Sequence, residues 1–194
     1  MGAMKSALEI ALEKTEKVKS DKAGINQFEA KQKGKKLANA YLSGEADLMN
    51  EIKQSPKEQL KSLKQGIFDV LITKIALPAV KGDEKFFEKT GKGLQAVIEN
   101  KQFPVLCGQL EQIFAQYLQE AAHYDQAIRQ QYAPKLRQKE EELSRRLGRE
   151  VRIDPSQDPE FNSFYNQHMK ALKDNYEPAI EQAKEETRRM FNEQ

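Results

Sequence analysis

Two stretches in the C-terminal half decide the fold of this chain: IRQQYAPKLRQKEEELSRRL at residues 128–147 and LKDNYEPAIEQAKEETRRMF at residues 172–191. Each places a Tyr-x-Pro motif ahead of a helix-forming run that carries a Glu-Glu pair and a following Arg, at an offset of 44 residues. A segment rich in Gly, Pro and Asp separates them. The pattern predicts two long helices joined by a turn. The similarity of the two stretches is explained either by duplication or by the convergence of charged helix surfaces.

Apolar and aromatic residues extend both stretches at helical spacing, about 3.7 residues per contact, which favours nearly straight helices. Gly148 is expected to end the first helix, and Asp158 to cap the second. A connection of about ten residues makes the helices antiparallel. We therefore expect a long helical hairpin at residues 103–194 with its tip near 148–158. In this register the residue numbers of two residues that face each other across the hairpin add up to about 305. Distances along the hairpin axis follow from the rise of about 1.5 Å per helical residue.

Two prolines, Pro134 and Pro178, lie inside the expected helices of the hairpin. In the predicted register they lie within about 10 Å of each other along the axis. Each removes an amide donor, so we expect a bend in both helices at nearly one level. The alternative is that each proline starts a separate helix.

The N-terminal part predicts a helical body over residues 1–100. We expect helices near 7–19 and 25–42, with a break at 21–24, a weak point at Gly34 and a stop at Ser43-Gly44. The most apolar run, GIFDVLITKIALPAV at 66–80, favours a buried helix, although its β-branched residues also permit a strand. Met1-Gly2-Ala3 ahead of Met4 is typical of a cloning remnant, and residues 1–4 are expected to be disordered. The predicted class is all-α.

Composition narrows the class of protein further. Charged residues make up 32% and hydrophobic residues 38% of the chain, which fits an elongated helical protein better than a compact sphere. A net charge of +2 implies no nucleic-acid or membrane partner by itself. The single cysteine, Cys107, excludes an internal disulfide and is expected to be a buried structural thiol. With no run of about 18 apolar residues and no signal region, a cytoplasmic location is expected.

Catalytic and metal-binding patterns do not assemble in this sequence. The two histidines, His123 and His168, are separated by about 20 Å in the predicted register, too far to share a metal ion. The Glu-rich runs carry neighbouring Lys and Arg and indicate solvated helix faces. No nucleophile motif or phosphate-binding loop is present. We therefore predict no catalytic residue, no cofactor and no metal ligand.

Two short segments are candidates for binding. Lys31, Lys33, Lys35 and Lys36 form a basic cluster that could contact phosphates, although a solvated helix face is the plainer interpretation. At the tip, residues 148–155 alternate charged and β-branched residues, which is typical of an extended segment that offers backbone groups to a partner. A structured turn that packs Val151 and Ile153 on the helix ends is the alternative. The tip residues that we expect to bind a partner are Arg149, Val151, Arg152 and Ile153.

These observations favour a non-enzymatic helical module for protein–protein interaction or scaffolding. The apolar edges of the hairpin suggest a homo-oligomer, with a dimer expected. The first alternative is weak nucleic-acid binding through Lys31–Lys36. The second is an enzyme with an unrecognised site between body and hairpin.

Overall fold

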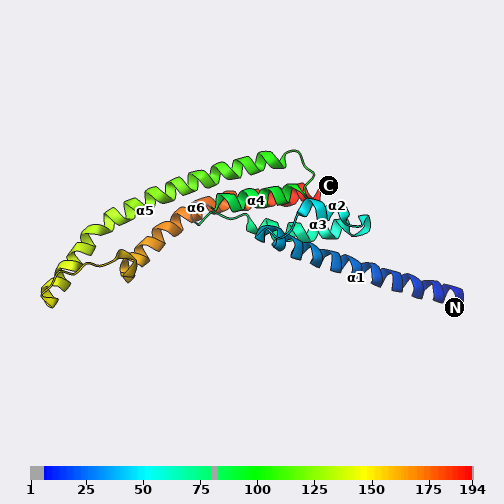
Figure 1. Ribbon diagram of the computed structural model, residues 1–194, viewed down its shortest axis with the longest axis horizontal. Coiled ribbons are helices and arrows are strands. Elements are labelled where there is room, and N and C mark those ends of the chain that lie inside the picture. The colour runs from blue at the N-terminus through cyan, green and yellow to red at the C-terminus, as the bar shows by residue number, and fades with distance from the viewer. Residues whose placement is uncertain (1–6, 80–82, 194) are drawn as a thin grey trace, which may run out of the picture. The chain divides into compact units, whose positions relative to one another are not determined.

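The computed structural model describes residues 7–79 and 83–193, and over these residues the chain is all-α with no strand, as predicted (Figure 1). The proposed remnant at residues 1–4 lies outside them. The α-helices are α1 (Ala7–Ser43), α2 (Leu48–Gln54), α3 (Lys57–Leu71), α4 (Glu84–Gln95), α5 (Phe103–Leu147) and α6 (Pro159–Asn192). Two short 3-10 turns, η1 (Ile72–Lys74) and η2 (Pro155–Gln157), complete the described elements.

The chain divides into two compact units. The first contains the chain up to Ile75, together with Lys85–Phe103 and the C-terminal end from Met190. The second contains Ala76–Glu84 and Pro104–Arg189. The last residues of α6 therefore belong to the unit that holds α1 to α4, whereas the sequence-based division assigned all of 103–194 to the hairpin.

The first unit is built around a close crossing of α1 and α3. A Cβ atom on Gly34 would lie 2.2 Å from the carbonyl oxygen of Leu63, and one on Gly66 would lie 2.1 Å from that of Lys31. Only glycine permits this approach of two backbones. Gly34 is therefore a packing residue. The break expected at residues 21–24 is wrong, since α1 is continuous from Ala7 to Ser43. A single helical glycine costs only about 1 kcal/mol, which a long helix tolerates.

The apolar run at 66–80 lies in the core of this unit. Its first part belongs to α3, so the favoured helix is confirmed, but α3 ends at Leu71 and passes into η1 instead of continuing towards Pro78. Phe68 stacks on Phe191, with ring centroids 4.1 Å apart and planes inclined by 14°. The residues of this run that are buried to 5% exposure or less are Ile67, Phe68, Leu71, Ile72 and Ile75.

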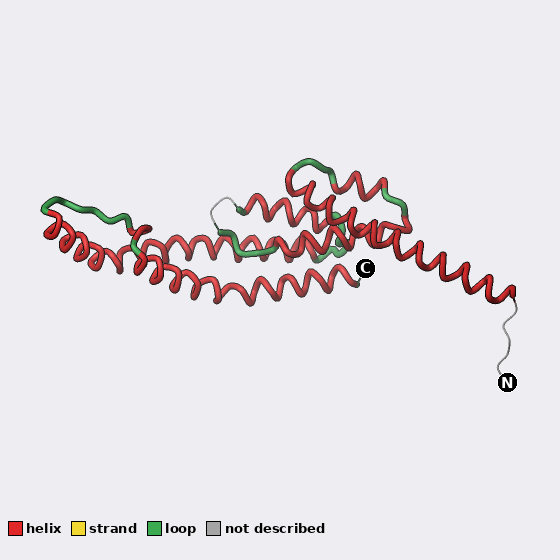
Figure 2. The backbone as a smooth tube through the Cα atoms, turned by 90° about the horizontal axis from the view of Figure 1, so that it is seen from below, coloured by secondary structure: helices red, strands yellow, loops and turns green. Residues whose placement is uncertain are grey.

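The second unit is the predicted antiparallel hairpin, formed by α5 and α6 (Figures 1 and 2). Aromatic side chains fill the seam between the helices. Tyr117 packs edge-on against Tyr176 at 5.3 Å, and Tyr132 packs edge-on against Phe161 at 5.3 Å. Such pairs add about 0.5–1.5 kcal/mol to the contribution of the area they bury. Other buried seam residues are Ile128, Leu172, Ile180, Ala183 and Thr187.

The register of the hairpin differs from the prediction. The numbers of both facing pairs, Tyr117 with Tyr176 and Tyr132 with Phe161, add up to 293 rather than 305. The connection is the cause, because residues 148–158 run back along the end of α5 before α6 begins (Figure 2). The prediction had placed these residues beyond the helix ends.

The altered register also corrects the predictions for the prolines. Both lie inside continuous helices, so the interpretation that each starts a new helix is wrong. Pro134 faces the start of α6 at Pro159, whereas Pro178 faces the region of residue 115. Their levels along the axis differ by about 28 Å, so the expected bend at a common level is wrong.

The two histidines lie closer to each other along the hairpin axis than predicted. In the observed register His123 and His168 lie within about 3 Å of each other along the hairpin axis, so the expected separation of 20 Å is wrong. His123 is exposed, whereas His168 is half-buried and packs edge-on against Phe164 at 4.4 Å.

Candidate functional site at the hairpin tip

Helix α5 is longer than the part of the hairpin in which two helices lie side by side. Because α6 starts opposite Pro134, the last 13 residues of α5 extend about 20 Å beyond the start of α6. Gly148 ends α5 as predicted, with φ of +65° and its N–H donated to the carbonyl of Ser144 at 2.9 Å. We call Lys135–Asp158, the end of α5 with its connection, the tip.

The connection is attached to α5 by hydrogen bonds from its backbone amides to side chains of the helix. The amide of Val151 donates to Ser144 Oγ at 2.9 Å, and the amide of Ile153 donates to Glu140 Oε1 at 2.8 Å. Alternate amides of an extended segment point to the same side, so both reach α5. Val151 and Ile153 are half-buried. The segment is thus a structured turn, and these two donors are engaged within the chain.

Asp158 fixes the base of the tip. Its side chain is buried, caps α6 by accepting from the amides of Glu160 and Phe161, and accepts from Lys139 Nζ at 2.7 Å. Lys139 Nζ also lies 3.1 Å from Glu160. The hydrogen bond from Lys139 lowers the pKa of Asp158, and the same bond raises the pKa of Lys139. Both groups are therefore charged at neutral pH, and the prediction of Asp158 as the cap is confirmed.

A groove of about 700 Å³ lies between the end of α5 and the connection. Val151 and Arg152 from the predicted set line it, while Arg149 is exposed outside the lining and the amide of Ile153 is bonded to Glu140. The side chains around the groove combine three guanidinium groups with three carboxylates. The full lining is Arg137, Glu140, Glu141, Ser144, Arg145, Glu150, Val151 and Arg152.

The tip also concentrates the arginines of the chain, a feature that the sequence reasoning missed. All eight arginines follow residue 128, and five of them lie between 137 and 152. Arg152 pairs with Glu150 at 3.4 Å, but the others form no ion pair with a described residue. The one-sided distribution was the available signal, because the body uses lysine alone. The tip arginines are Arg137, Arg145, Arg146, Arg149 and Arg152.

The lysine cluster on α1 does not form a single surface. Lys31 pairs with Asp69 of α3 at 2.8 Å, and Lys33 pairs with Glu51 of α2 at 3.5 Å. Helical residues advance by about 100° each, so Lys31 and Lys33 point in different directions. Lys35 is half-buried and Lys36 is exposed.

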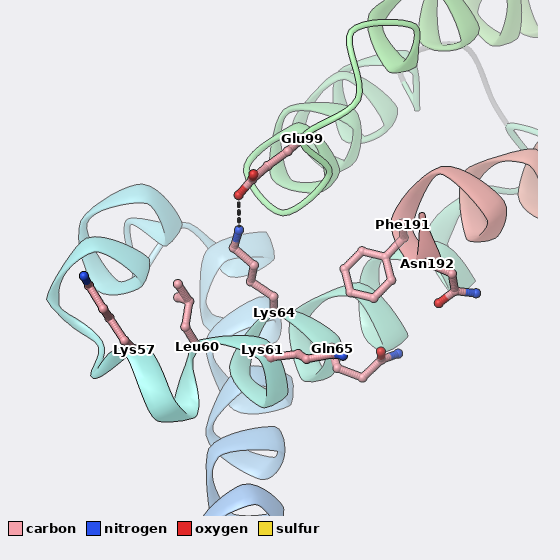
Figure 3. Close-up of a pocket in the computed structure, with 8 residues that line it drawn as sticks. All are labelled: Lys57, Leu60, Lys61, Lys64, Gln65, Glu99, Phe191 and Asn192. Carbon is pink, nitrogen blue, oxygen red and sulfur yellow. Dashed lines mark hydrogen bonds and ion pairs between the residues drawn. The ribbon is translucent and has the colours of Figure 1, made fainter. Parts of the chain in front are cut away.

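A second pocket, of about 370 Å³, lies in the first unit (Figure 3). It is lined by one side of α3, the turn after α4 and the last residues of α6. Lys64 forms an ion pair with Glu99 across it. The lining residues are Lys57, Leu60, Lys61, Lys64, Gln65, Glu99, Phe191 and Asn192.

Cys107 is half-buried, and burial, with a smaller effect of Glu111, raises its pKa to about 11. Such a thiol stays protonated at neutral pH. In the described part of the chain, no three His, Cys, Asp or Glu side chains are grouped so as to hold a metal ion. None of the helices described there is both long and apolar enough to traverse a bilayer.

Comparison with known proteins identifies the family but not a function. Residues 49–189 match the model of a family of unknown function, DUF6657, and the chain belongs to this family. The match includes the hairpin tip and the whole of α3, and it begins after α1. No curated protein and no solved structure matches the chain.

Proposed function

We propose that the chain is a non-enzymatic helical module that binds an acidic protein surface through the tip of its hairpin. The observation that carries this proposal is the concentration of five of the eight arginines on the tip. Four of them form no ion pair with a described residue, so their guanidinium groups are available to carboxylates of a partner. A guanidinium binds a carboxylate through two parallel hydrogen bonds, and arginine is enriched in protein interfaces.

The anchoring of the tip supports this assignment. Side chains of Ser144 and Glu140 hold the connection on α5, and the buried Asp158 with Lys139 fixes its base. A surface that is ordered before binding loses less conformational entropy on association. The tip is therefore suited to presenting its arginines in a fixed arrangement.

A charge-reversal experiment tests the proposal. The double variant Arg145→Glu/Arg152→Glu changes two groups of the groove, and Lys57→Glu/Lys61→Glu in the first unit provides the same change in net charge. Tagged forms of the wild type and both variants are captured from cells, and retained proteins are quantified by mass spectrometry. We expect a specific partner to be lost only with the tip variant. Equal retention by all three forms would contradict the proposal.

Self-association belongs to the same proposal, with a homodimer as the expected state. Ile25 and Phe28 on α1 support it, since they are three positions apart and 57% and 62% exposed. Large apolar side chains on one side of a helix favour burial against a second helix. Sedimentation at several concentrations measures the state, and Phe28→Glu should shift a dimer towards monomer. A wild type that stays monomeric at about 100 µM, well above a micromolar dissociation constant, would exclude the dimer.

A cytoplasmic location completes the proposal. It is supported by the single cysteine, Cys107, because one thiol forms no internal disulfide and the fold therefore does not depend on an oxidising compartment. Cell fractionation followed by immunodetection tests the location, and recovery outside the cytoplasm would contradict it.

A further inference from the structure

The charged groups of the tip groove that remain unpaired all belong to one helix. Among the carboxylates that line the groove, Glu140 accepts a hydrogen bond from the amide of Ile153. Glu150 forms an ion pair with Arg152, so both of these residues are engaged within the connection. Three charged residues of the lining form no ion pair with a described residue, and α5 carries all of them: Arg137, Glu141 and Arg145.

These three residues form a row along one side of α5. They follow one another at intervals of four residues, and helical residues four apart are neighbours on the helix surface. With a rise of about 1.5 Å per residue, each step is about 6 Å and the whole row is about 12 Å long. All three residues are exposed. The groove therefore presents a positive, a negative and a positive charge in that order.

We propose, building on the function proposed above, that the groove binds a partner helix whose exposed side carries acidic, basic and acidic residues four positions apart. A helix that lies along α5 repeats its side chains at the same step of about 6 Å, so three charges on each helix stay in register. The two carboxylates of the partner lie against Arg137 and Arg145. Its central Lys or Arg lies against Glu141.

Glu141 is the specificity-determining residue of this arrangement. A uniformly acidic partner would place a carboxylate against Glu141, and like charges that face each other across an interface oppose binding. A partner with a central cation replaces this repulsion by attraction. Specificity of this kind requires a group that penalises the wrong partner as well as groups that attract the right one. Among the residues described as lining the groove only Val151 is apolar, so charge decides which partner fits.

Two synthetic helices test the order of the charges. Both are alanine-based peptides of about 20 residues, a length that permits helix formation in water. One carries Glu, Lys and Glu at intervals of four residues, and the other carries Glu at all three positions. Chemical shifts of the isotope-labelled complete chain measure the two dissociation constants. We expect the wild type to bind the peptide with the central Lys about threefold or more tightly, and Glu141→Arg to reverse this preference.

Glu142→Arg is the matched control. It makes the same change in net charge at an exposed residue of α5 that is outside the groove lining, about 100° further round the helix. The ratio of the two dissociation constants should stay within about twofold of the wild-type ratio. Circular dichroism checks the fold of each variant. If Glu141→Arg fails to fold, Glu141→Gln replaces it and should remove most of the preference for the peptide with the central Lys.

Three results would overturn the proposed order of charges. The first is equal or tighter binding of the uniformly acidic peptide by the wild type. The second is a Glu141→Arg chain that keeps the wild-type preference, and the third is no chemical-shift change with either peptide at about 5 mM, above the millimolar range of weak binding. The binding of an acidic protein surface by the tip would still stand if Arg145→Glu/Arg152→Glu loses its captured partner. Retention of every captured protein by that variant would instead reject the proposed function itself.

Discussion

Gly34 of α1 and Gly66 of α3 lie against each other, so that a Cβ atom built on Gly34 would be 3.1 Å from the Cα atom of Gly66. Beside this contact Lys31 of α1 pairs with Asp69 of α3. Burial raises the pKa of Asp69, but hydrogen bonds from Lys31 and Gln65 outweigh burial and leave that pKa lowered. The crossing therefore combines a backbone contact with an ion pair at its edge.

The glycine contact predicts that Gly34→Ala destabilises the protein. The added methyl group would lie 2.2 Å from the carbonyl oxygen of Leu63, and this oxygen belongs to helical backbone that cannot rotate away. We expect a loss of about 3 kcal/mol in the free energy of unfolding, the upper end of the usual cost of overpacking. Urea denaturation followed by circular dichroism measures it.

Gly24→Ala is the matched control on the same helix. Nothing lies within 4 Å of a Cβ atom at this position, so the change should stabilise α1 by about 0.5–1 kcal/mol through the higher helix propensity of alanine. If the two variants have similar stability, the close crossing of α1 and α3 is wrong.

Two substitutions of Asp158 separate the stability that it contributes as a helix cap from the stability that its charge contributes. Asp158→Asn keeps an acceptor for the amides of Glu160 and Phe161 but loses the negative charge that faces Lys139. Asp158→Ala loses both. We expect Asp158→Ala to be less stable than Asp158→Asn by about 1 kcal/mol, the usual contribution of a helix N-cap. Hydrogen exchange should show faster exchange of the Val151 and Ile153 amides in both variants, and unchanged exchange would contradict the role of Asp158.

The same residue predicts a dependence on pH. The pKa of Asp158 is lowered in the folded protein, so its charge contributes stability above the unfolded pKa of about 3.9 and loses that contribution as the pH falls through the folded value. The stability difference between the wild type and Asp158→Asn should therefore be constant from about pH 5 to 8 and shrink below about pH 4. Urea midpoints at each pH measure the difference. A difference that grows on acidification would refute the ion pair with Lys139.

The prolines within the hairpin predict stabilising substitutions. Pro134 and Pro178 are exposed, and each leaves a helical carbonyl without its amide donor. Replacing either by alanine should raise the free energy of unfolding by about 1–3 kcal/mol. Thermal and urea denaturation measure the gain, and Gln138→Ala, at an exposed position of α5, should change stability by less than about 0.5 kcal/mol. Destabilisation by Pro134→Ala would mean that the irregularity at Pro134 is needed for packing.

Cys107 predicts slow alkylation. Its pKa of about 11 leaves little thiolate at pH 8, so iodoacetamide should react about 100-fold more slowly than with glutathione in the same buffer. The rate should rise about tenfold for each pH unit up to pH 10, as the thiolate fraction grows. Mass spectrometry of timed samples measures both thiols. A rate that levels off below pH 9 would show that burial does not raise this pKa.

Local signals in the sequence were sufficient for the class of fold and for several helix ends. Gly148 and Gly44 adopt positive φ beside helix ends, and Asp158 caps α6, because these features depend on one residue and its neighbours. The register of the two hairpin helices could not be predicted from such local signals. A connection of about ten residues permits both an open turn and one that folds back, and the choice depends on contacts of Ser144 and Glu140 with distant amides.

The candidate sites were predictable to a smaller extent. Val151 and Arg152 were identified from the alternation of residue types, and they line the groove. The pocket of the first unit was missed, since it joins Lys61 of α3 to Phe191 at the other end of the chain. No local pattern indicates that Phe191 stacks on Phe68.

Because α5 extends beyond the start of α6, the residues that stabilise the hairpin differ from the residues that form the surface of the tip. The aromatic contacts that stabilise the hairpin end near Tyr132 and Phe161, whereas the arginines and the groove lie beyond them. Substitutions between residues 137 and 157, apart from those that anchor the connection, leave the aromatic seam intact. The charges that the tip presents can therefore be changed while the stability of the hairpin is retained.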